Sequence, residues 1–143
     1  MTDGPRVVVD TNVLISRLLA PKSVPAQAVS DVVRHGRLLA SSATLEELAK
    51  VLGRTKFDRY LSLGERQQFM RLLARIVEIQ SITHRFTDCR DPSDNKFLDL
   101  AVSGSASFII SGDRDLLELH PFHKIPILKP ADYLDRIEPE RRR

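Results

Sequence analysis

The chain has 143 residues, 42% hydrophobic and 29% charged, and its 22 Lys and Arg against 19 Asp and Glu give a net charge of +3. This is the composition of an ordinary globular domain, and its mild positive charge permits nucleic-acid binding without requiring it. The single cysteine excludes an internal disulfide. No apolar run is long enough to cross a bilayer and residues 1–6 lack a signal-peptide pattern, so we expect a cytoplasmic protein with no membrane contact.

Strand and helix patterns alternate along the chain. A β-branched run over 6–9 predicts a buried strand, and apolar spacing then predicts helices over 11–20 and 24–35, the second ending at Gly36. We next expect a strand over 37–40, a helix capped by Ser41 or Ser42, a helix over 65–78, a weak strand over 79–83, a helix over 94–103, a strand over 107–111, a short helix, a strand over 125–128 and a helix over 130–137. Val33, Leu72 and Ile76 are expected to face the core.

This alternation predicts an α/β domain with a mainly parallel sheet. No repeat or linker divides the chain, so we expect one domain over 1–143, with its core over about 6–134. A basic tail is expected over about 138–143, in which Arg141, Arg142 and Arg143 are solvated.

Two acidic residues stand where apolar strands end. Asp10 follows 7–9, and Asp113 follows 108–110 after Ser111 and Gly112. Either acid alone is better explained as the N-cap of the next helix. The pair favours a functional role, because ligand sites of parallel sheets lie beyond the carboxyl ends of the strands.

Other acids are candidates with structural alternatives. Asp94 lies in the first turn of the helix over 94–103, where it could compensate the helix dipole behind a Ser93 cap. Asp99 lies about 140° from Asp94 on the helical wheel, and we keep it as a secondary candidate. Asp115 accompanies Asp113 and could belong to a simple turn.

Glu46 and Glu47 lie outside the apolar stripe of their helix, so periodicity does not choose between them. The pattern Thr44-x-x-Glu47 also matches a capping box.

Metal-assisted phosphoryl transfer is the chemistry that such acids suit. Clustered carboxylates raise one another's pKa, and a divalent cation removes that repulsion. Mg²⁺ and Mn²⁺ prefer oxygen ligands, lower the pKa of a water and neutralise charge on a phosphate. Among nitrogen and sulfur ligands, His120-x-x-His123 has too few companions for zinc, and Cys89 is the single cysteine of the chain.

Four motifs in order resemble those of PIN domains. They are VVVDTNVLIS over 7–16, S-x-T-x-x-E-L over 42–48, DPSDNKFLDLA over 91–101 and IISGDRDL over 109–116. The third looks most like the prokaryotic branch that contains toxin components of toxin–antitoxin systems. In the second, the acid stands just before the Leu, which selects Glu47 over Glu46. Ser111 stands where many relatives have Thr.

The resemblance implies a Rossmann-like three-layer sandwich with a central parallel sheet in the order 3-2-1-4-5. It also implies a ribonuclease that depends on Mg²⁺ or Mn²⁺, is commonly a homodimer and is often held inactive by an antitoxin that covers the acidic groove. The expected catalytic residues and metal ligands are Asp10, Glu47, Asp94 and Asp113, with Asp115 and secondarily Asp99 as further ligands.

Polar and basic residues around the acids are expected to assist. Asn12 and Ser111 would orient a carboxylate or a phosphate, although a helix cap is an equally good explanation of Asn12. The candidate contacts to RNA phosphate, each of which is more commonly only a solvated charge, are Arg17, Lys22, Arg54, Lys56, Lys96 and Arg114.

Two other classes of function compete with the nuclease. An aspartate-based phosphatase or phosphoacceptor domain would also place an Asp after a parallel strand, but Asp10-Thr11-Asn12 lacks the second Asp of dehalogenase-like phosphatases. A non-catalytic module that binds RNA or a protein partner would retain the fold, yet all four acids are present here. Cleavage of DNA remains a variant of the nuclease hypothesis.

Overall fold

The computed structural model describes residues 4–141, and its strands and helices alternate along the chain. Five parallel strands form one sheet in the order β3-β2-β1-β4-β5, which confirms the predicted topology. The strands are β1 (Arg6–Val9), β2 (Arg37–Ala40), β3 (Glu78–Ile79), β4 (Phe108–Ile110) and β5 (Ile127–Leu128).

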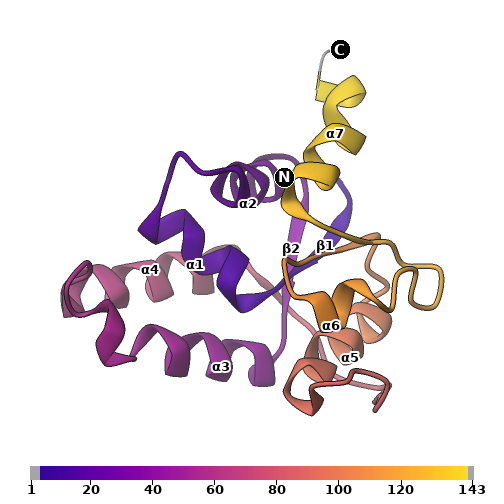
Figure 1. The fold of residues 1–143 in the computed structure, drawn as a ribbon, viewed down its shortest axis with the longest axis horizontal. Coiled ribbons are helices and arrows are strands. Elements are labelled where there is room, and N and C mark those ends of the chain that lie inside the picture. Colours follow the sequence, from indigo (N-terminus) through magenta and orange to yellow (C-terminus); the bar gives the residue numbers. More distant parts are fainter. Residues whose placement is uncertain (1–3, 142–143) are drawn as a thin grey trace.

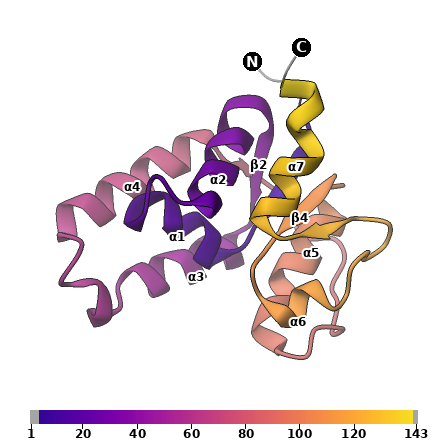
Figure 2. The same cartoon turned by 45° about the horizontal axis from the view of Figure 1, so that its top comes forward.

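Helices cover both faces of the sheet, as Figures 1 and 2 show. The helices are α1 (Thr11–Leu19), α2 (Val24–His35), α3 (Ser42–Leu52), α4 (Leu63–Ile76), α5 (Asn95–Ser103), α6 (Arg114–Leu117) and α7 (Pro130–Arg141), with the 3₁₀ turns η1 (Thr55–Phe57) and η2 (Pro92–Asp94). The three-layer α/β sandwich is therefore confirmed. Within residues 4–141, no helix has the length and apolar character needed to span a membrane.

The alternation of side chains along β1 explains why the sheet is covered on both faces. Val7 and Val9 belong to the apolar cluster shared with α1, α2, α3, α4 and α7. Val8 points to the opposite face and packs with α5 and α6. Because β1 is buried on both faces at the centre of the sheet, the residue that follows it is held in a fixed place.

Two capping boxes define the starts of α3 and α4. Ser41 caps α3, accepting from Thr44 N while the Thr44 hydroxyl accepts from Ser41 N, so Ser41 rather than Ser42 is the cap. Ser62 and Glu65 form the same arrangement at α4. The predicted helix over 65–78 therefore begins earlier, at Leu63, and ends at Ile76.

The predicted strand over 79–83 is wrong in its bounds. β3 is limited to Glu78–Ile79, which pair with Leu39 and Ala40 of β2. Glu78 is held at this edge by ion pairs with Arg6 and Arg37. From residue 80 to 91 the chain has no regular secondary structure, because no further strand pairs with it.

The expectation of a solvated tail is wrong for Arg141, whereas Arg142 and Arg143 lie outside the described residues. Helix α7 continues to Arg141, beyond the predicted end at 137, and lies against α2 (Figure 2). The Arg141 guanidinium pairs with Asp31 of α2, at 2.6 Å from Nε to Oδ2 and 2.9 Å from Nη2 to Oδ1. Ile137 belongs to the core, so the apolar core reaches beyond residue 134.

Three apolar residues predicted to be buried are exposed. Val33, Leu72 and Ile76 have exposed fractions of 41%, 53% and 46%. Each lines an apolar groove of about 630 Å³ on the α1, α2 and α4 side of the molecule. The helical periodicity identified apolar faces correctly, but these faces extend beyond what the core covers.

Candidate active site

Asp10 is fixed directly at the end of β1. Its backbone N–H donates to Ile110 O of β4 at 3.0 Å, which continues the pairing of the two strands. Its side chain caps α1, with Oδ1 accepting from Val13 N at 2.9 Å. Asp10 is only 6% exposed, and burial raises the pKa of its carboxyl against the opposing effect of its hydrogen bonds.

Ser111 connects Asp10 to Asp113. Its hydroxyl donates to Asp10 Oδ2, and its oxygen accepts from Asp113 N at 2.9 Å. Asp113 caps α6, with Oδ1 accepting from Asp115 N at 2.9 Å. Because β1 and β4 are neighbours in the sheet, acids distant in the sequence meet at this edge, and Ser111 is buried between them.

Among the acids at this edge of the sheet, Asp94 is the one whose negative charge has no compensating partner. It ends η2, precedes the first residue of α5 and is 9% exposed. Its Oδ2 is buried and has no hydrogen-bond partner among the described residues. Burial first, then a hydrogen bond that the protonated carboxyl makes to Asp113, and then the charges of Asp113, Asp91 and Glu47 raise the pKa of Asp94 to about 7.

Asp94, Asp113 and Asp115 come close enough to share one cation. One carboxylate oxygen from each lies within 4.8 Å of the other two. Oxygen-only donors, mutual repulsion and an orphaned buried oxygen on Asp94 fit a hard divalent cation such as Mg²⁺ or Mn²⁺. In the described part of the chain, this is the one group of three or more His, Cys, Asp or Glu side chains arranged in this way.

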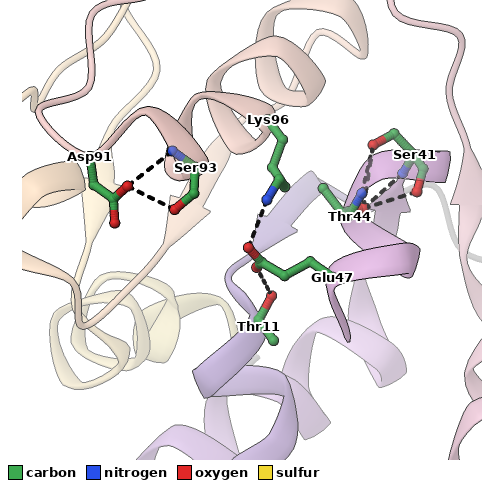
Figure 3. A network of polar contacts seen from close by, with 7 residues as sticks. All are labelled: Thr11, Ser41, Thr44, Glu47, Asp91, Ser93 and Lys96. Atoms are coloured by element: carbon green, nitrogen blue, oxygen red, sulfur yellow. Dashed lines mark hydrogen bonds and ion pairs between the residues drawn. The ribbon is translucent and has the colours of Figure 1, made fainter. Parts of the chain in front are cut away.

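Glu47 is partnered differently from Asp94. Its Oε1 accepts from Lys96 Nζ at 2.7 Å, and its Oε2 accepts from the Thr11 hydroxyl (Figure 3). The capping-box explanation of Glu47 is wrong. The N-cap of α3 is Ser41, and Thr44 is the N3 residue of the capping box that Ser41 forms. Sequence reasoning overlooked Thr11, although its place directly after Asp10 could have suggested it.

Several predicted residues lie apart from the three clustered carboxylates. Asp99 is turned to the loop before α5, where its Oδ1 accepts from Phe86 N at 2.7 Å. Asn12 is exposed on α1, and Asp10 rather than Asn12 is the helix cap. Arg114 is exposed next to Asp113 and pairs with Glu118 at 3.2 Å.

The remaining cations and the predicted Ser93 cap also have clear positions. Arg17, Lys22, Arg54 and Lys56 are exposed, and Arg17 lines the apolar groove. Ser93 does not cap α5. Instead its N–H and hydroxyl donate to Asp91, which caps η2 (Figure 3).

These features define a class of protein: a parallel α/β domain with a carboxylate cluster at the carboxyl ends of its central strands. The sequence matches the PIN domain family over residues 6–115. The chain belongs to this family, and its clustered acids fall within or at the end of the matched region.

Similar proteins support the same fold. The sequence is 28% identical over 146 residues to uncharacterized protein MJ1680 of Methanocaldococcus jannaschii, covering 93% of this chain and 92% of that protein. PAE2754 from Pyrobaculum aerophilum shares the fold with a TM-score of 0.63 at 11% identity, over 97% of this chain and 99% of that one. VapBC-1 from nontypeable Haemophilus influenzae gives 0.58 at 16% identity, over 88% and 98%. VapBC2 from Rickettsia felis, solved with a DNA fragment from its promoter, gives 0.55 at 14% identity, over 87% and 97%.

Proposed function

We propose that this PIN-domain protein is a metal-dependent endoribonuclease that hydrolyses phosphodiester bonds of RNA. The observation that carries the proposal is the convergence of Asp94, Asp113 and Asp115, with the pKa of Asp94 raised to about 7 and one of its oxygens unpartnered. Repulsion among these three carboxylates disfavours the folded protein, so a purely structural role does not explain why they are clustered. Binding of a metal cation that contacts a phosphate does explain it.

The proposed Mg²⁺ or Mn²⁺ is held by Asp94, Asp113 and Asp115, with Asp10 beside them. When bound, such an ion lowers the pKa of a water and neutralises charge on the phosphate. Asp10 accepts from the Val13 and Gly112 backbone N–H groups and from the Ser111 hydroxyl, all of them neutral donors, so its oxygens keep lone pairs for a cation. Ser111 orients both Asp10 and the backbone of Asp113.

The phosphatase alternative has weaker support from the site. Asp10-Thr11-Asn12 lacks the second Asp of dehalogenase-like phosphatases, and the Asp10 carboxylate, only 6% exposed, is held in place as the cap of α1. A binding-only module has no use for three repelling carboxylates, so hydrolysis remains the function that the geometry supports best.

A cleavage assay tests the proposal. Purified protein is incubated with end-labelled RNA in EDTA, and then with excess Mg²⁺ or Mn²⁺. We expect cleavage only with the metal, and none by an Asp113→Asn protein purified in the same way, which controls for contaminating nucleases. Cleavage that is equal in EDTA, or equal in the variant, contradicts the proposal. A DNA strand of the same sequence tests the substrate class.

We also propose that the protein is the toxin of a toxin–antitoxin pair and forms a homodimer. The resemblance of DPSDNKFLDLA over 91–101 to toxin components, and the fold shared with VapBC-1 and VapBC2, support the pairing. Val33, Leu72 and Ile76 in the apolar groove support contact with another protein chain. RNA and an antitoxin would meet such a toxin in the cytoplasm.

Growth and mass measurements test these partners. Expression of the chain should stop bacterial growth, and the Asp113→Asn variant should not. Light scattering of the purified protein should give twice the chain mass of 16.2 kDa. Normal growth with full expression contradicts the toxin proposal, and a monomeric mass contradicts the homodimer.

A further inference from the structure

An ion pair beside the acidic cluster joins three helices. Lys96 near the start of α5 donates from Nζ to Glu47 Oε1 of α3 at 2.7 Å, and the other Glu47 oxygen accepts from Thr11 at the start of α1. Figure 3 shows the Lys96 side chain extended toward Glu47, with Thr11 on the far side of the carboxylate. The two charged side chains are 23% and 20% exposed, so the pair is partly buried and still reachable from solvent.

This pair lies within electrostatic reach of the proposed metal site. Lys96 follows Asp94 by two residues, and the charge of Glu47 contributes to the raised pKa of Asp94. Glu47 is nevertheless outside the group of three carboxylates that could share one ion. The site therefore consists of an uncompensated acidic cluster and, next to it, a carboxylate that already has its own cation.

The two kinds of carboxylate call for different partners. Asp94 has a buried oxygen without any donor, so a cation from solution can offset its charge. Glu47 has both oxygens engaged, one of them by an ammonium, and is neutralised within the protein. An ammonium offers three donors, and only one of those of Lys96 is given to Glu47 in the structure.

We propose that Lys96, positioned by Glu47, is a second, protein-supplied cation of the site and binds a phosphate oxygen of the RNA beside a single divalent ion. This inference rests on the proposed function and deepens it: Glu47 becomes a positioning residue that acts through Lys96, not a metal ligand. An ammonium is a suitable point charge for a phosphate, and the partly buried pair limits the motion of the long lysine side chain.

Metal affinity separates this arrangement from one in which Glu47 is a ligand. Mn²⁺ binding is measured by isothermal titration calorimetry on wild type, Glu47→Gln, Lys96→Met and Asp113→Asn. We expect Glu47→Gln and Lys96→Met to bind within about twofold of wild type, whereas Asp113→Asn loses at least about tenfold. A tenfold loss in Glu47→Gln overturns the inference and makes Glu47 a ligand.

RNA affinity supplies the second readout. Binding of a labelled RNA is followed in EDTA, where cleavage is not expected, across a range of salt concentrations. We expect Lys96→Met and Glu47→Gln to weaken binding several-fold, and Lys96→Met to reduce the slope of log affinity against log salt by about 0.7. Lys96→Arg should retain the slope, because it keeps the charge.

Lys50→Met is the matched control, because Lys50 is exposed near the end of α3 and its loss changes the net charge equally. If Lys96→Met behaves like Lys50→Met, the inference fails. Wild-type protein that neither binds Mn²⁺ nor cleaves RNA contradicts the proposed function itself, so the two failures are distinguishable. Thermal melting of each variant shows whether it is folded.

Discussion

Two carboxylates of this molecule are similarly buried and have opposite surroundings. Asp31 of α2 has a side chain only 11% exposed, and it accepts hydrogen bonds from Tyr133 at 2.7 Å and from two nitrogens of Arg141. Asp94, which is 9% exposed, has an oxygen with no donor and faces Asp113. Burial would raise the pKa of Asp31, but Arg141 and Tyr133 outweigh it and lower that pKa, whereas the pKa of Asp94 rises to about 7.

The difference separates a structural ion pair at Asp31 from the metal site that we propose at Asp94. At Asp31 the protein supplies the partners, and the result is a clamp that holds α7 against α2. At Asp94 the protein supplies no such partner, and the carboxylates of Asp113 and Asp115 lie close by. The folded state therefore contains a repulsion between carboxylates that a cation can relieve. Changing each site should therefore affect different measurements.

The largest expected effect is on cleavage. Asp113→Asn or Asp10→Asn should reduce the rate by at least about 100-fold, because a divalent ion contributes several kcal/mol and about 1.4 kcal/mol corresponds to tenfold. Asn is also a good helix cap, so the folds should persist. Rates come from the RNA assay with Mn²⁺. Full activity in purified, folded Asp10→Asn protein would remove Asp10 from the site.

The matched change at the clamp should affect stability instead. Asp31→Asn should lower the free energy of unfolding by about 2 kcal/mol, since charged hydrogen bonds to Arg141 are lost, while cleavage stays within about twofold. Because the pKa of Asp31 is lowered, its contribution is present above the ordinary value of 3.8 and disappears as the pH falls through the folded value. Urea unfolding at pH 7 and pH 3 measures both effects, and an unchanged midpoint at pH 7 contradicts the clamp.

Metal affinity should depend on pH through Asp94. Its carboxyl has a pKa of about 7 and must lose a proton before it can bind a cation. Mn²⁺ affinity should therefore increase about tenfold for each unit by which the pH rises toward 7, and it should level off above pH 7. Calorimetry in two buffers of different ionisation enthalpy also counts the released protons. An affinity that is constant between pH 5 and pH 8 would contradict the role of Asp94.

The smallest effect is a gain of stability without metal. Asp94→Asn should raise the free energy of unfolding in EDTA at pH 8 by about 1 kcal/mol, because it removes a repelling charge. Since the folded pKa of Asp94 is raised, wild type loses stability as the pH rises from about 4 to about 7, and the variant does not. Since one pH unit between the two pKa values corresponds to about 1.4 kcal/mol, this advantage should already vanish between pH 6 and pH 7, and the variant should be the less stable protein at pH 5. A less stable variant at both pH values would mean that Asp94 supports the fold.

The sheet order and the meeting of Asp10 with Asp113 could be predicted from the sequence. Apolar strands fix which residues are buried, and the PIN motifs fix which strands are neighbours. The boundaries of β3 could not be predicted, because Ile79 belongs to an edge strand that depends on pairing rather than on its own residues.

Contacts between side chains that lie far apart in the chain could also not be predicted from the sequence. By their spacing alone, Thr44 and Glu47 fit a capping box. In the structure Thr44 instead forms the box with Ser41, and Glu47 accepts a hydrogen bond from Lys96. Arg141 appeared solvated because nothing near it in the chain indicates Asp31, over a hundred residues away. Such pairings are decided by tertiary packing rather than by local pattern.

A crystal structure of the protein soaked in Mn²⁺ would show where the ion binds, because anomalous scattering locates the ion independently of the protein density. We expect one peak in contact with carboxylate oxygens of Asp94, Asp113 and Asp115. A well-ordered site that stays empty at saturating Mn²⁺, or an ion bound only at other side chains, would contradict it.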